Sequence, residues 1–176
     1  MNIEQIINFS CPRWDELPSQ GLFNREVVSY INQILEPIVD KDQELTETMV
    51  QNYSKWQMIP KIKGRKYERI QIAYLLVITI YKQILNIKQV YEGVDNLLSR
   101  MDTKEAYDAF AQSLENAIRS IFMPVIDGRS YEITDLNIKR DDIGVVAIAY
   151  AFSLKLFSSV LIDQKGLSKL TDYKKD

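Results

Sequence analysis

The chain has 176 residues and a formal net charge of −2, and 46% of its residues are hydrophobic while 26% are charged. This composition excludes a disordered protein and fits one compact domain, or a small domain with an extension. The chain has no histidine and one cysteine, Cys11, which removes the usual general base, the commonest metal ligand and any intrachain disulfide. We therefore expect a non-enzyme of the reducing cytoplasm, without a metal site or a cofactor.

Residues 1–23 are predicted to form an N-terminal arm. A short helix is possible over residues 2–9, and Pro12, Pro18 and Gly21 then favour extended chain. The segment lacks the basic start and the unbroken apolar run of a signal peptide, so we do not expect export.

Residues 24–99 are predicted to form the main domain. Asn24 is a plausible N-cap for its first helix, and Pro37 is expected to end or bend that helix. Thr46 is a good N-cap for a second helix, which Pro60 should stop. Gly64 then supplies a turn position that tolerates positive φ, and a small β-wing is expected around it.

The second helix is predicted to have an inward and an outward face. Four side chains share the inward face: Leu45, Met49, Tyr53 and Trp56. Four turn mostly outward and are candidates for contacts with bases or phosphates: Thr48, Gln51, Asn52 and Lys55. Their alternative role is simple solvation of a surface helix.

A basic stretch follows this helix. Residues 53–69 contain six Lys or Arg and one acid, Glu68, a local balance of +5 in a chain of net charge −2. Four of these cations flank Gly64: Lys61, Lys63, Arg65 and Lys66. Such a concentration of positive charge attracts a polyanion, so we expect these side chains to lie along DNA phosphates.

Three further helices are predicted over residues 68–85, 87–98 and 102–123, the last ending at Pro124. The first is apolar around most of its circumference and should be the central core helix. Residues 100–176 are expected to form a C-terminal helical region that packs on the main domain or dimerises. Asp127-Gly128 could turn a short hairpin in the connector that follows Pro124.

The final helix, residues 143–162, has one charged side chain, Lys155. Its length suffices to cross a bilayer, but glycine, serines and the central lysine lower its hydrophobicity, so we expect a buried packing or dimer helix and no membrane span. Five residues at helical spacing could form a dimer or partner interface, or be buried in the same subunit: Val145, Ala149, Phe152, Leu156 and Val160. An effector pocket is a further possibility, lined by Tyr107, Phe110, Phe122, Tyr150 and Phe152, although such aromatics are more often core and no effector is indicated.

Residues 45–93 resemble the DNA-binding head of MerR-type regulators. That family pattern has a helix with a Leu and a Tyr, then Gly-Leu-x-Pro, then a Gly-x-Arg-x-Tyr wing. Val50, Tyr53, Met58 and Pro60 fall on the helix and turn positions, and Gly64, Arg65 and Tyr67 fit the wing when one residue is dropped. Gln51 stands where the family usually has a phosphate-binding Arg, and Gln57 replaces the turn Gly.

A second resemblance, over residues 21–99, is to an uncharacterised bacterial family, domain of unknown function family 1836 (DUF 1836). Three sequence segments carry this resemblance: GLFNREVVSYIN, LTETMVQNYSKWQMIPK and GRKYERIQIAYLLVI. Together the resemblances imply an all-α protein with a MerR-like winged helix-turn-helix, a small β-wing and a C-terminal helical extension.

These observations lead to two hypotheses. The first is a DNA-binding transcriptional regulator, a homodimer on double-stranded DNA, that presents residues 46–57 to the major groove and its basic turn to the phosphates. The alternative is a protein-interaction or dimerisation module that has lost DNA binding. The operator, the regulated genes and the effector are not indicated by the sequence.

Overall fold

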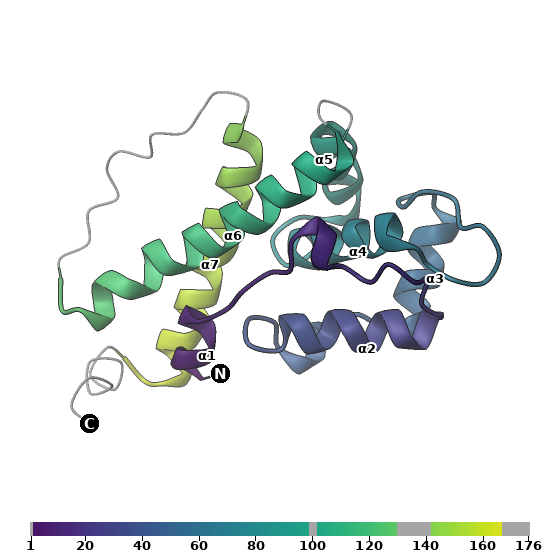
Figure 1. Ribbon diagram of the computed structural model, residues 1–176. Coiled ribbons are helices and arrows are strands. Elements are labelled where there is room, and N and C mark those ends of the chain that lie inside the picture. The colour runs from purple at the N-terminus through teal and green to yellow at the C-terminus, as the bar shows by residue number, and fades with distance from the viewer. Residues whose placement is uncertain (1, 99–101, 130–141, 167–176) are drawn as a thin grey trace.

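The computed structural model describes residues 2–98, 102–129 and 142–166. Within these ranges the chain is all-helical, with seven α-helices and no strand (Figure 1), so the predicted all-α class is confirmed. The helices are α1 (Ile3–Ile7), α2 (Asn24–Leu35), α3 (Glu47–Lys55), α4 (Arg69–Tyr81), α5 (Ile87–Leu98), α6 (Thr103–Ile126) and α7 (Ile143–Asp163). Short 3-10 turns lie at Trp14–Glu16 and Lys41–Gln43.

Helix α4 is the centre of the fold. All of its side chains from Gln71 to Tyr81 are buried except that of Tyr74, which is half-buried, and it contacts α2, α5, α6 and α7. It ends at Tyr81, earlier than the predicted residue 85, because the backbone N–H of Gln83 donates to the carbonyl of Ile80, three residues back, at 3.0 Å. This tightening ends the helix and turns the chain into α5.

The N-terminal arm is fastened along α6. Glu115, in the middle of α6, is buried and accepts hydrogen bonds from Arg13 Nη1 at 2.8 Å and from the backbone N–H of Cys11 at 2.9 Å. The hydroxyl of Tyr107, about two turns before Glu115 on α6, donates to the carbonyl of Pro12 at 2.9 Å. The predicted extended arm therefore forms part of the core, and α1 packs against α6 as well.

Helix α6 continues through Pro124 to Ile126, so the prediction that Pro124 ends it was wrong. Proline removes its own N–H from the helical ladder and crowds the carbonyl four residues before it, but the helix survives for one more turn: the N–H of Asp127 still donates to the carbonyl of Met123 at 2.9 Å. The expected Asp127-Gly128 hairpin is instead the end of this helix, where Gly128 takes a left-handed φ of 67°. Residues 130–138 of the predicted connector lie outside the described residues.

Helix α7 packs against α6. The five residues predicted as a dimer or partner interface, Val145, Ala149, Phe152, Leu156 and Val160, are all buried within the chain, so a partner could contact them only if α7 separated from α6. Among the described helices, α7 is the one that is long and apolar enough to cross a membrane by length and composition. About one third of its most apolar window, 33%, is buried inside the chain.

Candidate nucleic-acid interface

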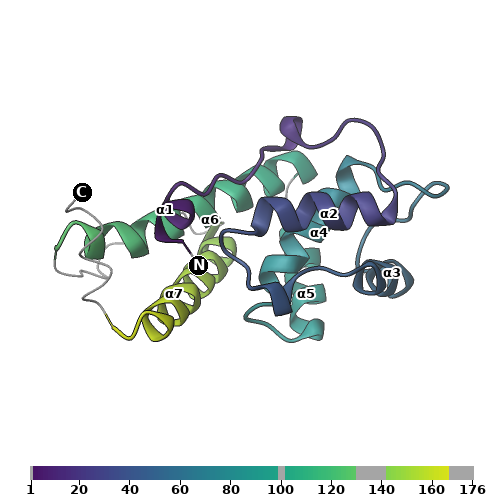
Figure 2. The same ribbon diagram turned by 90° about the horizontal axis from the view of Figure 1, so that it is seen from below.

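Helix α3 starts where the sequence predicts. The Oγ1 of Thr46 accepts a hydrogen bond from the backbone N–H of Met49 at 3.2 Å, which satisfies one free N–H of the first turn. The preceding connector is held by α2, because Asn32 bonds both the N–H and the carbonyl of Leu45 at 2.9 Å. These contacts fix α3 across the N-terminal end of α2 (Figures 1 and 2).

The predicted cap of α2 was wrong by one residue. Asn24 is the first residue of the helix, and Phe23 is its N-cap. The N–H of Phe23 donates to the Glu26 carboxylate at 2.7 Å. Asn24 instead uses its Nδ2 to reach the carbonyl of Glu47 at 3.2 Å, which ties α2 to the first turn of α3.

The outward face of α3 carries three of the four predicted contact residues. Thr48, Gln51 and Lys55 are exposed, whereas Asn52 is half-buried. The inward face differs from its prediction at Trp56, which is 53% exposed rather than core. Trp56 is the C-cap of α3 and lies past the last helical residue. Its ring contacts that of buried Tyr53, with the ring centroids 6.4 Å apart, but stays largely exposed.

Helix α3 ends at Lys55, so the prediction that Pro60 stops it was also wrong. The chain reverses at Gln57, which takes a left-handed φ of 56°, and the N–H of Met58 donates to the carbonyl of Tyr53 at 2.9 Å. Met58 and Ile59 are then buried. A left-handed residue followed by two buried apolar side chains turns the chain sharply toward the segment that contains the basic residues.

Residues 60–68 form a loop, here named the basic loop, whose two ends are joined by one buried side chain. The Nε2 of Gln71 lies 3.4 Å from the carbonyl oxygen of Pro60 and 3.3 Å from that of Lys61, and its Oε1 accepts from the N–H of Glu68 at 2.8 Å. Gln71 is 3% exposed. Gln71 therefore holds both ends of the basic loop at the start of α4, while Gly64 at the tip takes a φ of 89°.

The C-terminal part of the basic loop is hydrogen-bonded to the N-terminal arm. Leu22 and Tyr67 exchange backbone hydrogen bonds of 2.8 and 2.9 Å as an isolated antiparallel bridge. Along the described chain this pair does not extend into a strand, so the predicted β-wing is not found and a loop stands in its place. Beside this bridge, Gly21 packs closely on Lys66, since an added Cβ would lie only 2.9 Å from Lys66 Cβ, and Phe23 then caps α2.

Four cations of the basic loop, Lys61, Lys63, Arg65 and Lys66, are exposed. None of them forms an ion pair with any residue in the described part of the chain. Lys66 Nζ lies 4.9 Å from the centroid of the Phe23 ring, and Arg69 turns toward the arm, 3.8 Å from Asp15. The loop projects beyond α3 at the right-hand edge of Figures 1 and 2.

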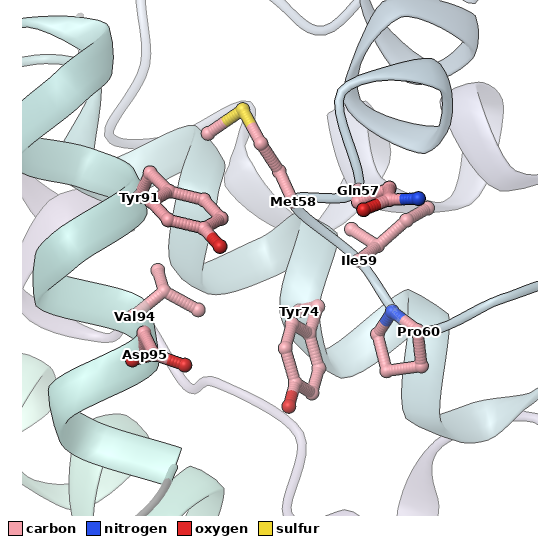
Figure 3. A pocket seen from close by; sticks show the side chains of 8 residues that line it. All are labelled: Gln57, Met58, Ile59, Pro60, Tyr74, Tyr91, Val94 and Asp95. Atoms are coloured by element: carbon pink, nitrogen blue, oxygen red, sulfur yellow. The ribbon is translucent and has the colours of Figure 1, made fainter.

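A hollow of about 200 Å³ lies behind the turn that follows α3 (Figure 3). It is lined by Gln57, Met58, Ile59, Pro60, Tyr74, Tyr91, Val94 and Asp95. Burial, and then the negative charge of Asp95, raise the pKa of Tyr74. Helix α5 therefore faces, across this hollow, the turn that leads into the basic loop.

The aromatics considered for an effector pocket are mostly core side chains. Of the aromatics considered for an effector pocket, Tyr107, Phe110, Phe122 and Phe152 are buried in the core and Tyr150 is half-buried. In the described ranges, no group of three or more Cys, Asp or Glu side chains is arranged to hold a metal ion.

Two structurally important sets of contacts, those of Gln71 and the pairing of Arg13 with Glu115, were missed at the level of sequence. Gln71 follows Glu68 by three residues, which is capping-box spacing and a usable signal, although nothing local indicates its bonds to Pro60 and Lys61. The pairing of Arg13 with Glu115 joins residues 102 positions apart, and no local pattern predicts such a contact.

Comparison with known proteins identifies a family. No curated protein and no solved structure matches the chain. A family model described as domain of unknown function (DUF1836) matches residues 12–110, which is more than half of the chain and includes the arm from Pro12, α2 to α5 and the start of α6. The chain therefore belongs to the DUF1836 family.

Proposed function

We propose that this protein binds double-stranded DNA as a transcriptional regulator, with α2 and α3 acting as a helix-turn-helix and the basic loop acting as its wing. The observation that carries the proposal is the group of four exposed cations on a projecting loop, none of them paired with a described carboxylate. Unpaired lysine and arginine side chains need no prior ion pair to be broken before they bind phosphate.

The contacts on either side of the loop support this role. Gln71 and the Leu22–Tyr67 bridge hold the two ends of the basic loop, which follows α3 in the chain. Phosphate contacts made by the loop would therefore fix the register of α3 on DNA. Thr48, Gln51 and Lys55 are exposed on α3. In this proposal Gln51 reads a base edge, because an amide can bond adenine at two positions.

The resemblance to MerR-type heads adds one further point. Gln57 has a left-handed φ of 56° at the position where that family pattern has its turn glycine. The same change of chain direction is thus made by a different residue, which supports a common path from the recognition helix to the wing even though the described loop contains no strand.

Neutralisation of the basic loop tests the proposal. The variant K61A/K63A/R65A/K66A is expected to lose at least about tenfold in affinity for duplex DNA at low salt, because each lost phosphate contact removes a counterion-release contribution. Fluorescence anisotropy with a labelled duplex measures this. The control K41A/K88A/R129A/K165A removes the same formal charge from other exposed positions and should bind as the wild type does. Equal losses in both variants would refute a localised DNA site.

The second candidate is a protein-interaction module without DNA binding. It is favoured by exposed apolar side chains outside the basic loop, namely Trp56, Ile87 and Tyr91, whose exposed fractions are 53%, 46% and 48%. This candidate predicts that the four-residue neutralisation leaves partner binding unchanged. Duplex affinity that is weak even at low salt would favour it.

A further inference from the structure

The outward face of α7 carries an apolar stripe that stays exposed in the folded chain. Its members recur at three or four residues: Ile143, Ala147, Ala151, Leu154, Ser158 and Ile162. Ile162 is 76% exposed, Ile143 57% and Leu154 39%. In Figure 2, α7 lies along the lower edge of the molecule with no other helix beyond it. Large apolar side chains that stay exposed along one helix face, with only small residues between them, are typical of an interaction site.

The stripe is symmetric about the point between Phe152 and Ser153. Positions 143 and 162, 147 and 158, and 151 and 154 lie at equal distances on either side of it. In a two-fold interface, residue i contacts residue j of the other copy and residue j contacts residue i. An antiparallel pair of α7 helices would therefore place large residues opposite each other at the ends and small residues, Ala147 and Ser158, opposite each other in between.

We propose that a second copy of this chain covers the stripe, so that the protein is a two-fold dimer joined by antiparallel α7 helices. Near the axis, Ala151 of each copy lies opposite Leu154 of the other, and the small side chain leaves room for the large one. Small residues along the seam allow two helix backbones to approach closely.

The flanks of the stripe widen this contact. One flank carries the half-buried apolar side chains of Val146, Tyr150 and Leu161, and a two-fold axis perpendicular to the helices brings that flank against its own copy. A stable interface covers about 800 Å² per partner, so the flank is needed as well as the stripe. Lys155 lies on the other flank, where its Nζ is bound to the Gln83 carbonyl at 3.0 Å.

A second copy suits the stripe better than a lipid bilayer. The opposite face of α7 is buried against α6 through Val145, Phe152 and Leu156, and a spanning helix would have to give up these contacts. A dimer keeps them and covers only the exposed face. The proposal does not depend on DNA binding, since α7 and the basic loop are separate elements.

Sedimentation analysis of the full chain tests the dimer. The wild type is expected to sediment at twice the 20.5 kDa of the chain. Ala151→Glu places two charges near the axis and should weaken the dimer about tenfold or more. Ser120→Glu adds the same charge at an exposed position of α6 and should leave the dimer intact. A wild-type monomer at high micromolar concentration would overturn the proposal.

Cysteine cross-linking tests the register and does not require a destabilising variant. Under mild oxidation, a mixture of Ala147→Cys and Ser158→Cys chains should form a disulfide-linked dimer, whereas each variant alone should not. Cys11 does not interfere, because it is buried and burial raises the pKa of its thiol to about 12. Self-linking of the Ala147→Cys chain would contradict the antiparallel register. Flotation with phosphatidylcholine vesicles that is abolished by Ala151→Glu would show that lipid, not a second copy, covers the stripe.

Discussion

Gln57 holds the turn between α3 and the basic loop in a backbone conformation that most residues avoid. Its φ of 56° lies in the left-handed region, where a side chain with a Cβ is strained and glycine is not. Its side chain is exposed and lines the hollow beside Tyr74 and Tyr91. The strain is therefore a local cost of the turn, and it is not relieved by burial of the side chain.

Replacing Gln57 by glycine should relieve this strain. Gln57→Gly is expected to raise the free energy of unfolding by about 0.5–1 kcal/mol, because the gain in the folded state exceeds the entropy added to the unfolded chain. Gln51→Gly, within α3, should instead lower it by about 1 kcal/mol. Urea denaturation of both variants measures the difference, and destabilisation by Gln57→Gly would contradict the strained turn.

Glu115 is the residue on which the arm depends. Burial alone would raise the pKa of its carboxyl, but hydrogen bonds from Arg13 and from the backbone of Cys11 outweigh burial, and the pKa lies below its usual value. A carboxylate with a lowered pKa in the folded state stabilises the fold above its unfolded pKa, and this contribution disappears as the pH falls through the folded pKa.

Glu115→Gln should therefore destabilise the protein in a manner that depends on pH. At neutral pH the loss is expected to be about 1–3 kcal/mol, because Arg13 loses its charged partner. The difference in the free energy of unfolding between wild type and variant should narrow as the pH falls below the ordinary glutamate pKa of about 4.3, and it should disappear as the pH passes through the lowered pKa of the folded Glu115 carboxyl. Glu105→Gln, at an exposed position of the same helix, is the control, and chemical denaturation across this pH range is the measurement. A difference in the free energy of unfolding that does not change with pH would contradict a stabilising role for the ionised Glu115 carboxylate.

At the scale of elements, the basic loop is a segment without regular secondary structure that is held at both ends. Gln71 bonds Pro60, Lys61 and Glu68, and the arm pairs with Tyr67. These few bonds, and not a strand ladder, define its position. The loop can therefore be released by a single substitution at its base.

Limited trypsin digestion can detect that release, since the loop contains four exposed cleavage sites. Gln71→Ala should increase the rate of cleavage in the loop several-fold, because the buried amide bonds are lost. Gln71→Glu keeps an acceptor for the N–H of Glu68 but loses the donor to Pro60 and Lys61, so it should also be cleaved faster. The exposed Gln33→Ala is the control. Wild-type cleavage rates in both Gln71 variants would show that the amide does not hold the loop.

The predicted elements were correct where local signals were sufficient. Helix periodicity located every long helix, and the Thr46 cap and the positive φ of Gly64 were both predicted. The errors occurred where distant contacts outweighed local preference. Pro124 stays helical because the following turn still forms its hydrogen bonds. Where a β-wing was predicted, the loop is held by the bonds of Gln71 and by the single Leu22–Tyr67 bridge.

The candidate site was only partly predictable for the same reason. The exposure of Thr48, Gln51 and Lys55 follows from the spacing of apolar residues on one short helix. The exposure of Trp56 does not, because it depends on where α3 ends. The burial of Val145 and its four companions against α6 depends on how the chain returns to pack two helices that are separated by a connector.

The whole molecule combines a basic loop with an otherwise acidic chain. Since residues 53–69 carry +5 and the chain carries −2, the remaining residues sum to −7. A polyanion is thus attracted to one region and repelled by the rest, which favours approach to the loop side of the molecule. The family match stops at residue 110, inside α6, so α7 and its exposed stripe lie outside the part shared with the family model.

The central claim is that the basic loop binds DNA phosphates, and the salt dependence of duplex binding tests it most directly. If four cations each neutralise one phosphate, the plot of log affinity against log salt should have a slope steeper by about 3.6 for the wild type than for K61A/K63A/R65A/K66A. The K41A/K88A/R129A/K165A control should retain the wild-type slope. A wild-type slope near zero, or one that the loop variant leaves unchanged, would contradict the account.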